Sequence, residues 1–155
     1  MQTRKSVTIA NELVGVVETA SQKLRLLQET EVSQKPAPGK WSKKEILGHL
    51  IDSATNNHQR FVRAQMTDAL TFPGYEQDEW VRRQDYNAKP WNELVELWRL
   101  FNRHVAHIIR NLSEEKIQTP VRIGQAAEPM ALGLIVEDYL THMRHRLHQL
   151  GVVNV

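Results

Sequence analysis

Four segments of this 155-residue chain repeat apolar residues at the three- and four-residue intervals of an α-helix. The spacing predicts helices at residues 6–30, 42–68, 90–111 and 130–150. No segment alternates apolar and polar residues for long enough to predict a sheet, and the extended stretch 121–123 is short and isolated. Four amphipathic helices predict an all-α fold, a four-helix bundle formed as a single domain over residues 1–155.

The breaks between these helices have chemical causes. Two prolines and a glycine at 36–39 cannot continue a helix. Ser42 and Glu45 then form the pattern of a capping box, which marks a helix start. Gly151 follows the last apolar residue, as a C-terminal cap would. The stretch 71–89 is a long loop with four aromatic residues, so we expect it to pack over another part of the chain.

Composition excludes several classes of protein. The 20 basic and 18 acidic residues alternate along the chain, without the basic face expected of a nucleic-acid-binding protein. No apolar run approaches the roughly 18 residues of a membrane span, and no apolar stretch follows the first charged residues as in a signal peptide. Cysteine is absent, which excludes disulfides and thiolate ligands and fits a cytoplasmic location. We expect a small-molecule substrate, no nucleic acid and no membrane.

Histidines are the candidate chemistry-bearing residues. His49 lies in the second predicted helix beside a polar stripe that is typical of either a solvated face or a functional one: Glu45, Asp52, Ser53, Asn56 and Arg60. His142 and His145 are three positions apart in the last helix and could bind one ion, although histidines also favour the C-terminal end of a helix for its dipole. For His148 we adopt that second interpretation.

Three motifs resemble those of the DinB-like superfamily. They are residues 41–52 followed by Asn56-Asn57 and Arg60-Phe61, residues 72–80, and residues 137–150. The resemblance implies a four-helix bundle, and many members hold a metal on three histidines. His49 and His142 match the first two ligands, whereas the third position falls on Arg146.

Arginine stays protonated and cannot coordinate a metal, so Arg146 leaves two alternatives open. In one, His145 or water completes a weakened site on His49 and His142. In the other, no metal binds, and Arg146 stands in the pocket as a fixed cation that favours an anion.

The resemblance implies a metal-dependent hydrolase, or a transferase that uses a low-molecular-weight thiol, with nickel or zinc as the divalent metal. Glu45, Asp52 and Asn56 would then line the pocket or orient the ligands, as would Arg146. The alternative is a catalytically degenerate binding module whose metal site is weakened by Arg146. The resemblance also implies a homodimer, for which Ile46 and Phe61 are candidate contacts.

Overall fold

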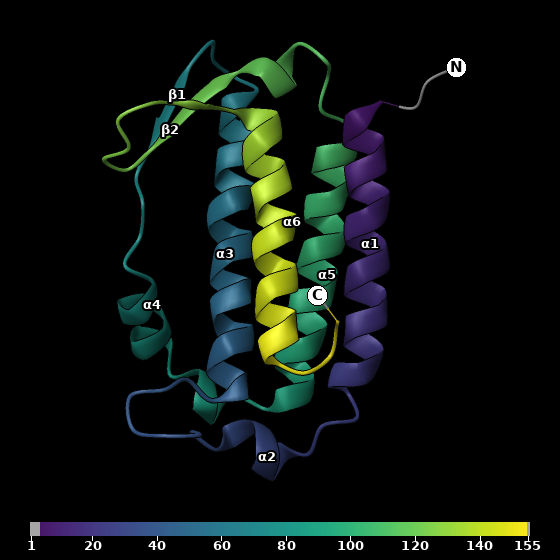
Figure 1. Ribbon diagram of the computed structural model, residues 1–155, viewed down its shortest axis with the longest axis vertical. Helices are drawn as coiled ribbons and strands as arrows, with labels where there is room; N and C mark the ends of the chain where they lie inside the picture. The colour runs from purple at the N-terminus through teal and green to yellow at the C-terminus, as the bar shows by residue number, and fades with distance from the viewer. Residues whose placement is uncertain (1–3, 155) are drawn as a thin grey trace.

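Four long helices run side by side in the computed structural model, which describes residues 4–154 (Figure 1). Their neighbour pairs are α1 with α5 and α6, and α3 with α5 and α6, so the four close around one core. The predicted four-helix bundle is confirmed. The bundle helices are α1 (Lys5–Leu24), α3 (Lys43–Ala64), α5 (Trp91–Arg110) and α6 (Leu132–Gln149). The shorter ones are α2 (Glu29–Ser33), α4 (Gln77–Gln84) and the 3₁₀ turns Tyr86–Ala88 and Lys116–Gln118.

Helix boundaries agree with the sequence patterns except at the end of α1. That helix stops at Leu24, not at residue 30, and the chain turns toward α2. The Leu24 carbonyl there accepts hydrogen bonds from the Leu27 N–H of the turn and from the Trp91 indole N–H, at 3.1 and 2.8 Å. The predicted capping box is present at the start of α3: Ser42 Oγ accepts from the Glu45 N–H, and Glu45 accepts from the Ser42 N–H. Gly151 ends α6 with φ of 77°, the left-handed conformation that glycine adopts most easily.

A small sheet corrects the sequence analysis, which expected none. Strand β1 (Leu70–Phe72) pairs in parallel with β2 (Pro120–Ile123), and β2 pairs antiparallel with β3 (Met130–Ala131). The extended stretch at 121–123 is therefore not isolated. These strands have two to four residues each, too few to produce a visible alternation. The sheet joins the chain that follows α3 to the chain that precedes α6.

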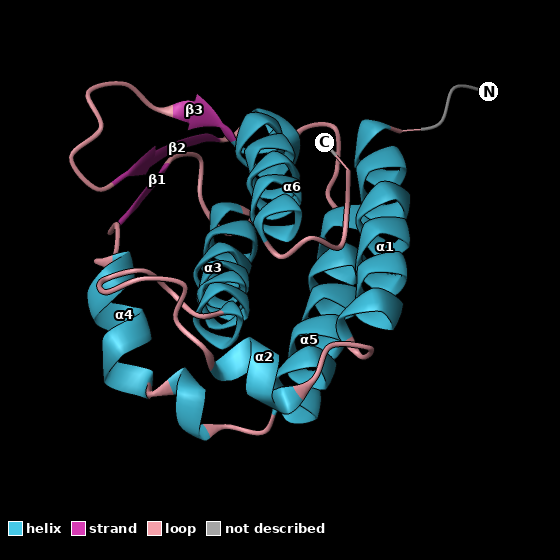
Figure 2. Cartoon of the chain, turned by 60° about the horizontal axis from the view of Figure 1, so that its bottom comes forward, coloured by secondary structure: helices cyan, strands magenta, loops and turns pink. Residues whose placement is uncertain are grey.

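The aromatic segment 71–89 packs on the outer side of α3, as expected, but it contains α4 and a 3₁₀ turn (Figures 1 and 2). Val81 and Tyr86 are its buried anchors. The Tyr86 ring lies against the backbone of Gly48, where a Cβ would come within 2.1 Å of Tyr86 Cδ2. A residue with no side chain is therefore required for this segment to lie so close to α3.

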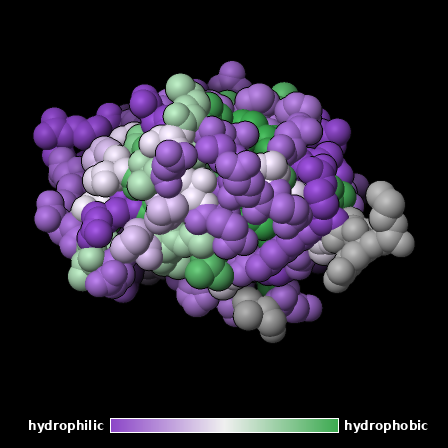
Figure 3. Space-filling model, turned by 90° about the horizontal axis from the view of Figure 1, so that it is seen from above, coloured by the Kyte–Doolittle hydropathy of each residue, from purple (hydrophilic) through white to green (hydrophobic). Residues whose placement is uncertain are grey.

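Apolar side chains of all four long helices fill the core, and Phe61 is fully buried among them. The expectation that Phe61 contributes to a dimer surface is therefore wrong, and Ile46 is partly buried. Seen from the end that carries the sheet, the surface is predominantly hydrophilic with smaller apolar areas (Figure 3). Within residues 4–154, none of the helices combines the length and apolar character needed to cross a membrane.

Candidate functional site

One face of α3 is polar and yet buried. His49, Ser53, Asn57 and Arg60 follow one another at intervals of four, four and three residues, which places them in one row along the helix. Each is between 1% and 7% exposed. This row is thus covered by the segment that follows β1 and by α6, and it is not a solvated face. Buried polar side chains in such a row are typical of a binding site.

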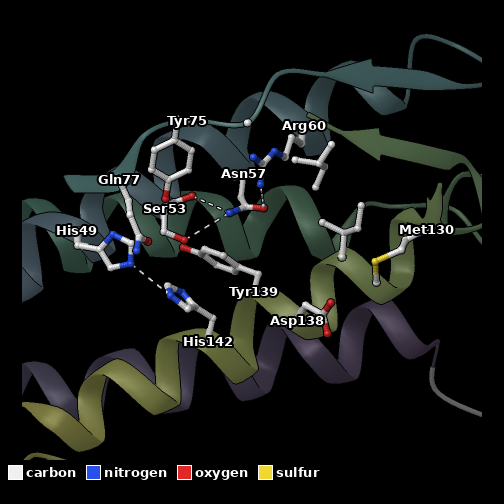
Figure 4. Close-up of a pocket in the computed structure, with 13 residues that line it drawn as sticks. His49, Ser53, Asn57, Arg60, Tyr75, Gln77, Met130, Asp138, Tyr139 and His142 are labelled. Carbon is white, nitrogen blue, oxygen red and sulfur yellow. Dashed lines mark hydrogen bonds between the residues drawn. The ribbon is translucent and has the colours of Figure 1, made fainter. Parts of the chain in front are cut away.

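This row forms one wall of a cavity of about 370 Å³ (Figure 4). Helix α6 forms the opposite wall with Asp138, Tyr139 and His142. Tyr75, which precedes α4, and Gln77, the first residue of α4, also line the cavity. Figure 4 shows the two histidines at one end and Arg60 toward the other, with Ser53 and Asn57 between them. The volume is in the range that binds small molecules.

His49 and His142 meet across the cavity. Their Nε2 atoms are 3.2 Å apart, and the rings are nearly perpendicular, at 85°. The Trp41 ring also packs against His49, with 5.0 Å between centroids. His49 Nδ1 is buried without a hydrogen-bond partner. The structure therefore brings together the two histidines that the resemblance singled out.

Both imidazoles are held in the neutral form. The pKa of His49 is lowered to about 3, mainly by burial, and the charges of His142 and Arg146 contribute in the same direction. Burial also lowers the pKa of His142, and Arg146 and then His145 act in the same direction. A neutral imidazole has a free nitrogen lone pair, which is the form that coordinates a metal.

The nitrogen separation suits a shared metal ion. Two nitrogens bound at 2.0–2.1 Å to a tetrahedral zinc ion are about 3.3 Å apart, close to the observed 3.2 Å. Two imidazoles are nevertheless one ligand fewer than a catalytic zinc site normally has. In the part of the chain that the structure describes, no group of three or more His, Asp or Glu side chains is arranged around one point.

His145 lies apart from the cavity: it is exposed and does not line the wall. Around the helix it is about 60° from His142 and about 100° from Arg146. Arg146 lies one turn after His142, with its guanidinium carbon 5.4 Å from the Trp41 ring centroid. Its Nη1 donates to Gln149 Oε1 at 3.0 Å, and it lines a neighbouring cavity with Trp41. Arg146 therefore lowers the pKa of both histidines through its charge, although its side chain does not line their cavity.

The other predicted pocket residues lie outside this cavity. Glu45 is occupied by the helix cap and an ion pair with Lys35. Asp52 faces the outer segment and accepts hydrogen bonds from Tyr86 at 2.6 Å and Gln84 at 2.8 Å. Burial raises the pKa of Asp52, against the lowering effect of those two bonds. Asn56 donates back to the Asp52 carbonyl and lines a separate cavity beside α4.

Sequence reasoning missed several wall residues. Asn57 could have been found, since it repeats the spacing of His49 and Ser53 on one face of α3. Tyr139 gave no signal: its ring packs edge-on against Phe61, and its hydroxyl donates to the buried Asn102. Tyr75 was one of several aromatic residues in its segment, with nothing to distinguish it.

Comparison with known proteins agrees with this architecture. The sequence profile of the DinB superfamily matches residues 13–150. "Putative metal-dependent hydrolase OB0413" of Oceanobacillus iheyensis is 24% identical over 93% of this chain and 90% of its own length. A protein of the same description, BH0277 of Halalkalibacterium halodurans, is 24% identical over 78% of this chain and 70% of its own. The structure of YfiT from Bacillus subtilis superposes with a TM-score of 0.82 and 16% identity, over 95% of this chain and 87% of its own. YfiT is described as a probable metal-dependent hydrolase with an unusual four-helix bundle topology.

Proposed function

Since the chain belongs to the DinB superfamily, we propose that it is a metal-dependent hydrolase of a small molecule, with His49 and His142 as ligands of the metal. The observation that carries this proposal is the 3.2 Å separation of two neutral imidazole nitrogens at the wall of a cavity. The description of its relatives as metal-dependent hydrolases supports the same class of reaction.

A divalent ion at this position would lower the pKa of a water molecule, so that a nucleophile is available near neutral pH. Burial keeps the rings of His49 and His142 neutral, which is the form of imidazole that coordinates a metal. The Trp41 ring packs against His49, which is buried from solvent. The hydroxyls of Ser53 and Tyr75 and the amide of Asn57 line the cavity beyond the histidines, where they can hydrogen-bond to the substrate.

Imidazole is a suitable ligand for both zinc and nickel, so both metals are tested. Isothermal titration of the metal-free protein with each ion should give a single site. The variants His49→Ala and His142→Ala should each weaken that site at least about tenfold, because one of two ligands is lost. His145→Ala is the matched control, since His145 is an exposed histidine of the same helix. Weakening by His145→Ala equal to that of His142→Ala would refute the assignment of the ligands.

A second candidate, a metal-free binding module, is favoured by Arg146. This residue occupies the position that the resemblance gives to the third ligand, and its charge acts on both histidines. In that case the titration shows no site for zinc or nickel in the unaltered protein, and the cavity binds a small molecule without reaction.

The same site could activate an added thiol in place of water, which would make the protein a transferase. The absence of cysteine requires the thiol to come from a small-molecule cofactor. Product analysis with and without an added low-molecular-weight thiol separates the two reactions: a hydrolase forms product without it, whereas a transferase forms a thioether only in its presence.

A further inference from the structure

Arg60 is a buried cation that has no acidic partner within residues 4–154. Its side chain belongs to the cavity wall, and the residue is 7% exposed. The guanidinium donates one long hydrogen bond, from Nη1 to Asn57 Oδ1 at 3.3 Å, while its Nε is buried without a partner. Among the described side chains, no aspartate or glutamate comes within ion-pair distance of it. The Phe72 ring, 5.7 Å from the guanidinium carbon, is its one cation–π neighbour.

The second deeply buried basic residue of the described chain shows the contrast. Lys44 is 2% exposed, and its ammonium pairs with Glu29 and donates to the carbonyls of Asn87 and Lys89. Charged side chains are rarely buried unless they are paired in this way. The fold therefore satisfies Lys44 from its own residues but leaves most of the Arg60 hydrogen-bonding capacity unused.

We propose that Arg60 binds an anionic group of the substrate, a carboxylate or a phosphoryl group, at the end of the cavity away from the histidine pair. Guanidinium is the side chain best suited to these two groups, which it holds by charge and by parallel hydrogen bonds. Ser53 and Tyr75 line the same cavity and supply hydroxyl groups beside it. Asp138 lines the opposite wall, but it is exposed and forms no ion pair with Arg60.

The helix geometry sets the relation between the two ends of the substrate. His49 and Arg60 are 11 residues apart, which is about 16 Å along the helix axis and close to three full turns, so both side chains point to the same face. The long arginine side chain reaches back into the shared cavity. This inference deepens the proposed function: the reacting bond would lie at the histidines while the anionic group is held by Arg60.

Three probes of similar shape distinguish the ligand chemistry: benzoate, phenyl phosphate and the neutral benzamide. Their binding is measured by isothermal titration to the full-length, metal-free protein in the presence of a chelator. We expect one of the two anions to bind at least tenfold more tightly than benzamide. Which of them binds tighter identifies the carboxylate or the phosphoryl group. Equal affinities for all three probes would overturn the proposal.

The variant Arg60→Gln should abolish the preference for the anion, and Arg60→Lys, which keeps the charge, should retain part of it. Arg63→Gln is the matched control, because Arg63 lies on the same helix, is exposed, and also has its guanidinium near the Phe72 ring, at 5.9 Å. A preference that survives in Arg60→Gln, or that is lost in Arg63→Gln, would refute the role of Arg60.

A second readout guards against a variant that simply misfolds. Each saturating anion should raise the melting temperature of the unaltered protein and of Arg63→Gln, but not that of a folded Arg60→Gln. Because the probes are tested without metal, the result is independent of the proposed function. If His49→Ala loses zinc binding but still binds the anion, both proposals are supported. If the unaltered protein binds the anion but neither zinc nor nickel, the role of Arg60 is supported and the proposed hydrolase function is refuted.

Discussion

Replacing Gly48 by alanine tests the close approach of the outer segment to α3. The new Cβ would lie 2.1, 2.4 and 2.5 Å from the Cδ2, Cγ and Cε2 atoms of Tyr86. Carbon atoms in ordinary contact are about 3.5–4.0 Å apart, so the ring has to move by roughly 1–2 Å. The Tyr86 hydroxyl moves with the ring, away from the buried Asp52 oxygen to which it donates at 2.6 Å.

The expected cost follows from three contributions. Overpacking of a buried site costs about 1–3 kcal/mol. A buried carboxylate that loses this donor costs about 1–3 kcal/mol more, and the other oxygen of Asp52 already has no partner. Alanine in a helix returns about 1 kcal/mol relative to glycine. The free energy of unfolding should therefore fall by about 3 kcal/mol, which lowers the melting temperature by about 6–12 °C in a protein of this size.

Urea unfolding and calorimetry measure both quantities. Gly15→Ala is the matched control, since Gly15 is exposed on α1 with nothing within 4 Å of the added Cβ, and it should gain about 0.5–1 kcal/mol. Tyr86→Phe isolates the hydrogen bond and should cost about 1–2 kcal/mol. If Gly48→Ala is as stable as the unaltered protein, the ring does not lie on the helix backbone and the reasoning is wrong.

Four further outcomes are expected. Arg146→His should raise the affinity for zinc or nickel at least about tenfold in calorimetric titration, because it removes a repulsive charge and adds a donor one turn from the pair; an equal gain in His145→Ala would contradict this. The pKa of His49 is about 3 in the folded protein and 6.5 ordinarily, so unfolding takes up a proton at any pH between these two values. The free energy of unfolding should therefore fall as the pH drops below about 6.5, by at most about 1.4 kcal/mol per pH unit. Urea unfolding from pH 7.5 to 5 should show a flatter dependence for His49→Gln. Ser42→Ala should cost about 1 kcal/mol through loss of the α3 cap. Urea unfolding measures it beside Ser33→Ala, a half-buried serine whose hydroxyl donates only within its own helix. Light scattering at micromolar concentration should report a homodimer, and a monomer there would contradict that expectation.

The bundle could be predicted because its signals are local. Helical spacing of apolar residues, the Ser42–Glu45 cap and the glycine after α6 each lie within a few residues of one another. The sheet could not be predicted, because its strands are short and β1 pairs with β2 across about 50 residues of sequence. Nothing local in residues 70–72 indicates the partner at 121–123.

The candidate site was predictable only in part, for a similar reason. His49 and His142 were found through motifs, and the structure brings them together. Asp52 lies only about 60° and Asn56 only about 20° around α3 from His49. Asp52 nevertheless bonds to Tyr86 and Asn56 lines a separate cavity, so membership of the polar stripe did not decide their surroundings. Tyr139 required knowledge of how α6 packs on α3.

The parallel pairing of β1 with β2 has a consequence for the order in which the molecule folds. Helices form from contacts within a few residues, whereas this pairing must close a loop of about 50 residues before it gains any hydrogen bond. We expect the bundle to assemble first and the sheet to form late on the folding pathway. The segment from Phe72 to Tyr86 is tethered at one end by that sheet, so the polar face of α3 stays open to water until then. The cavity is thus the last part of the protein to be completed, and substitutions in the strands should slow its closure more than they slow the collapse of the helices.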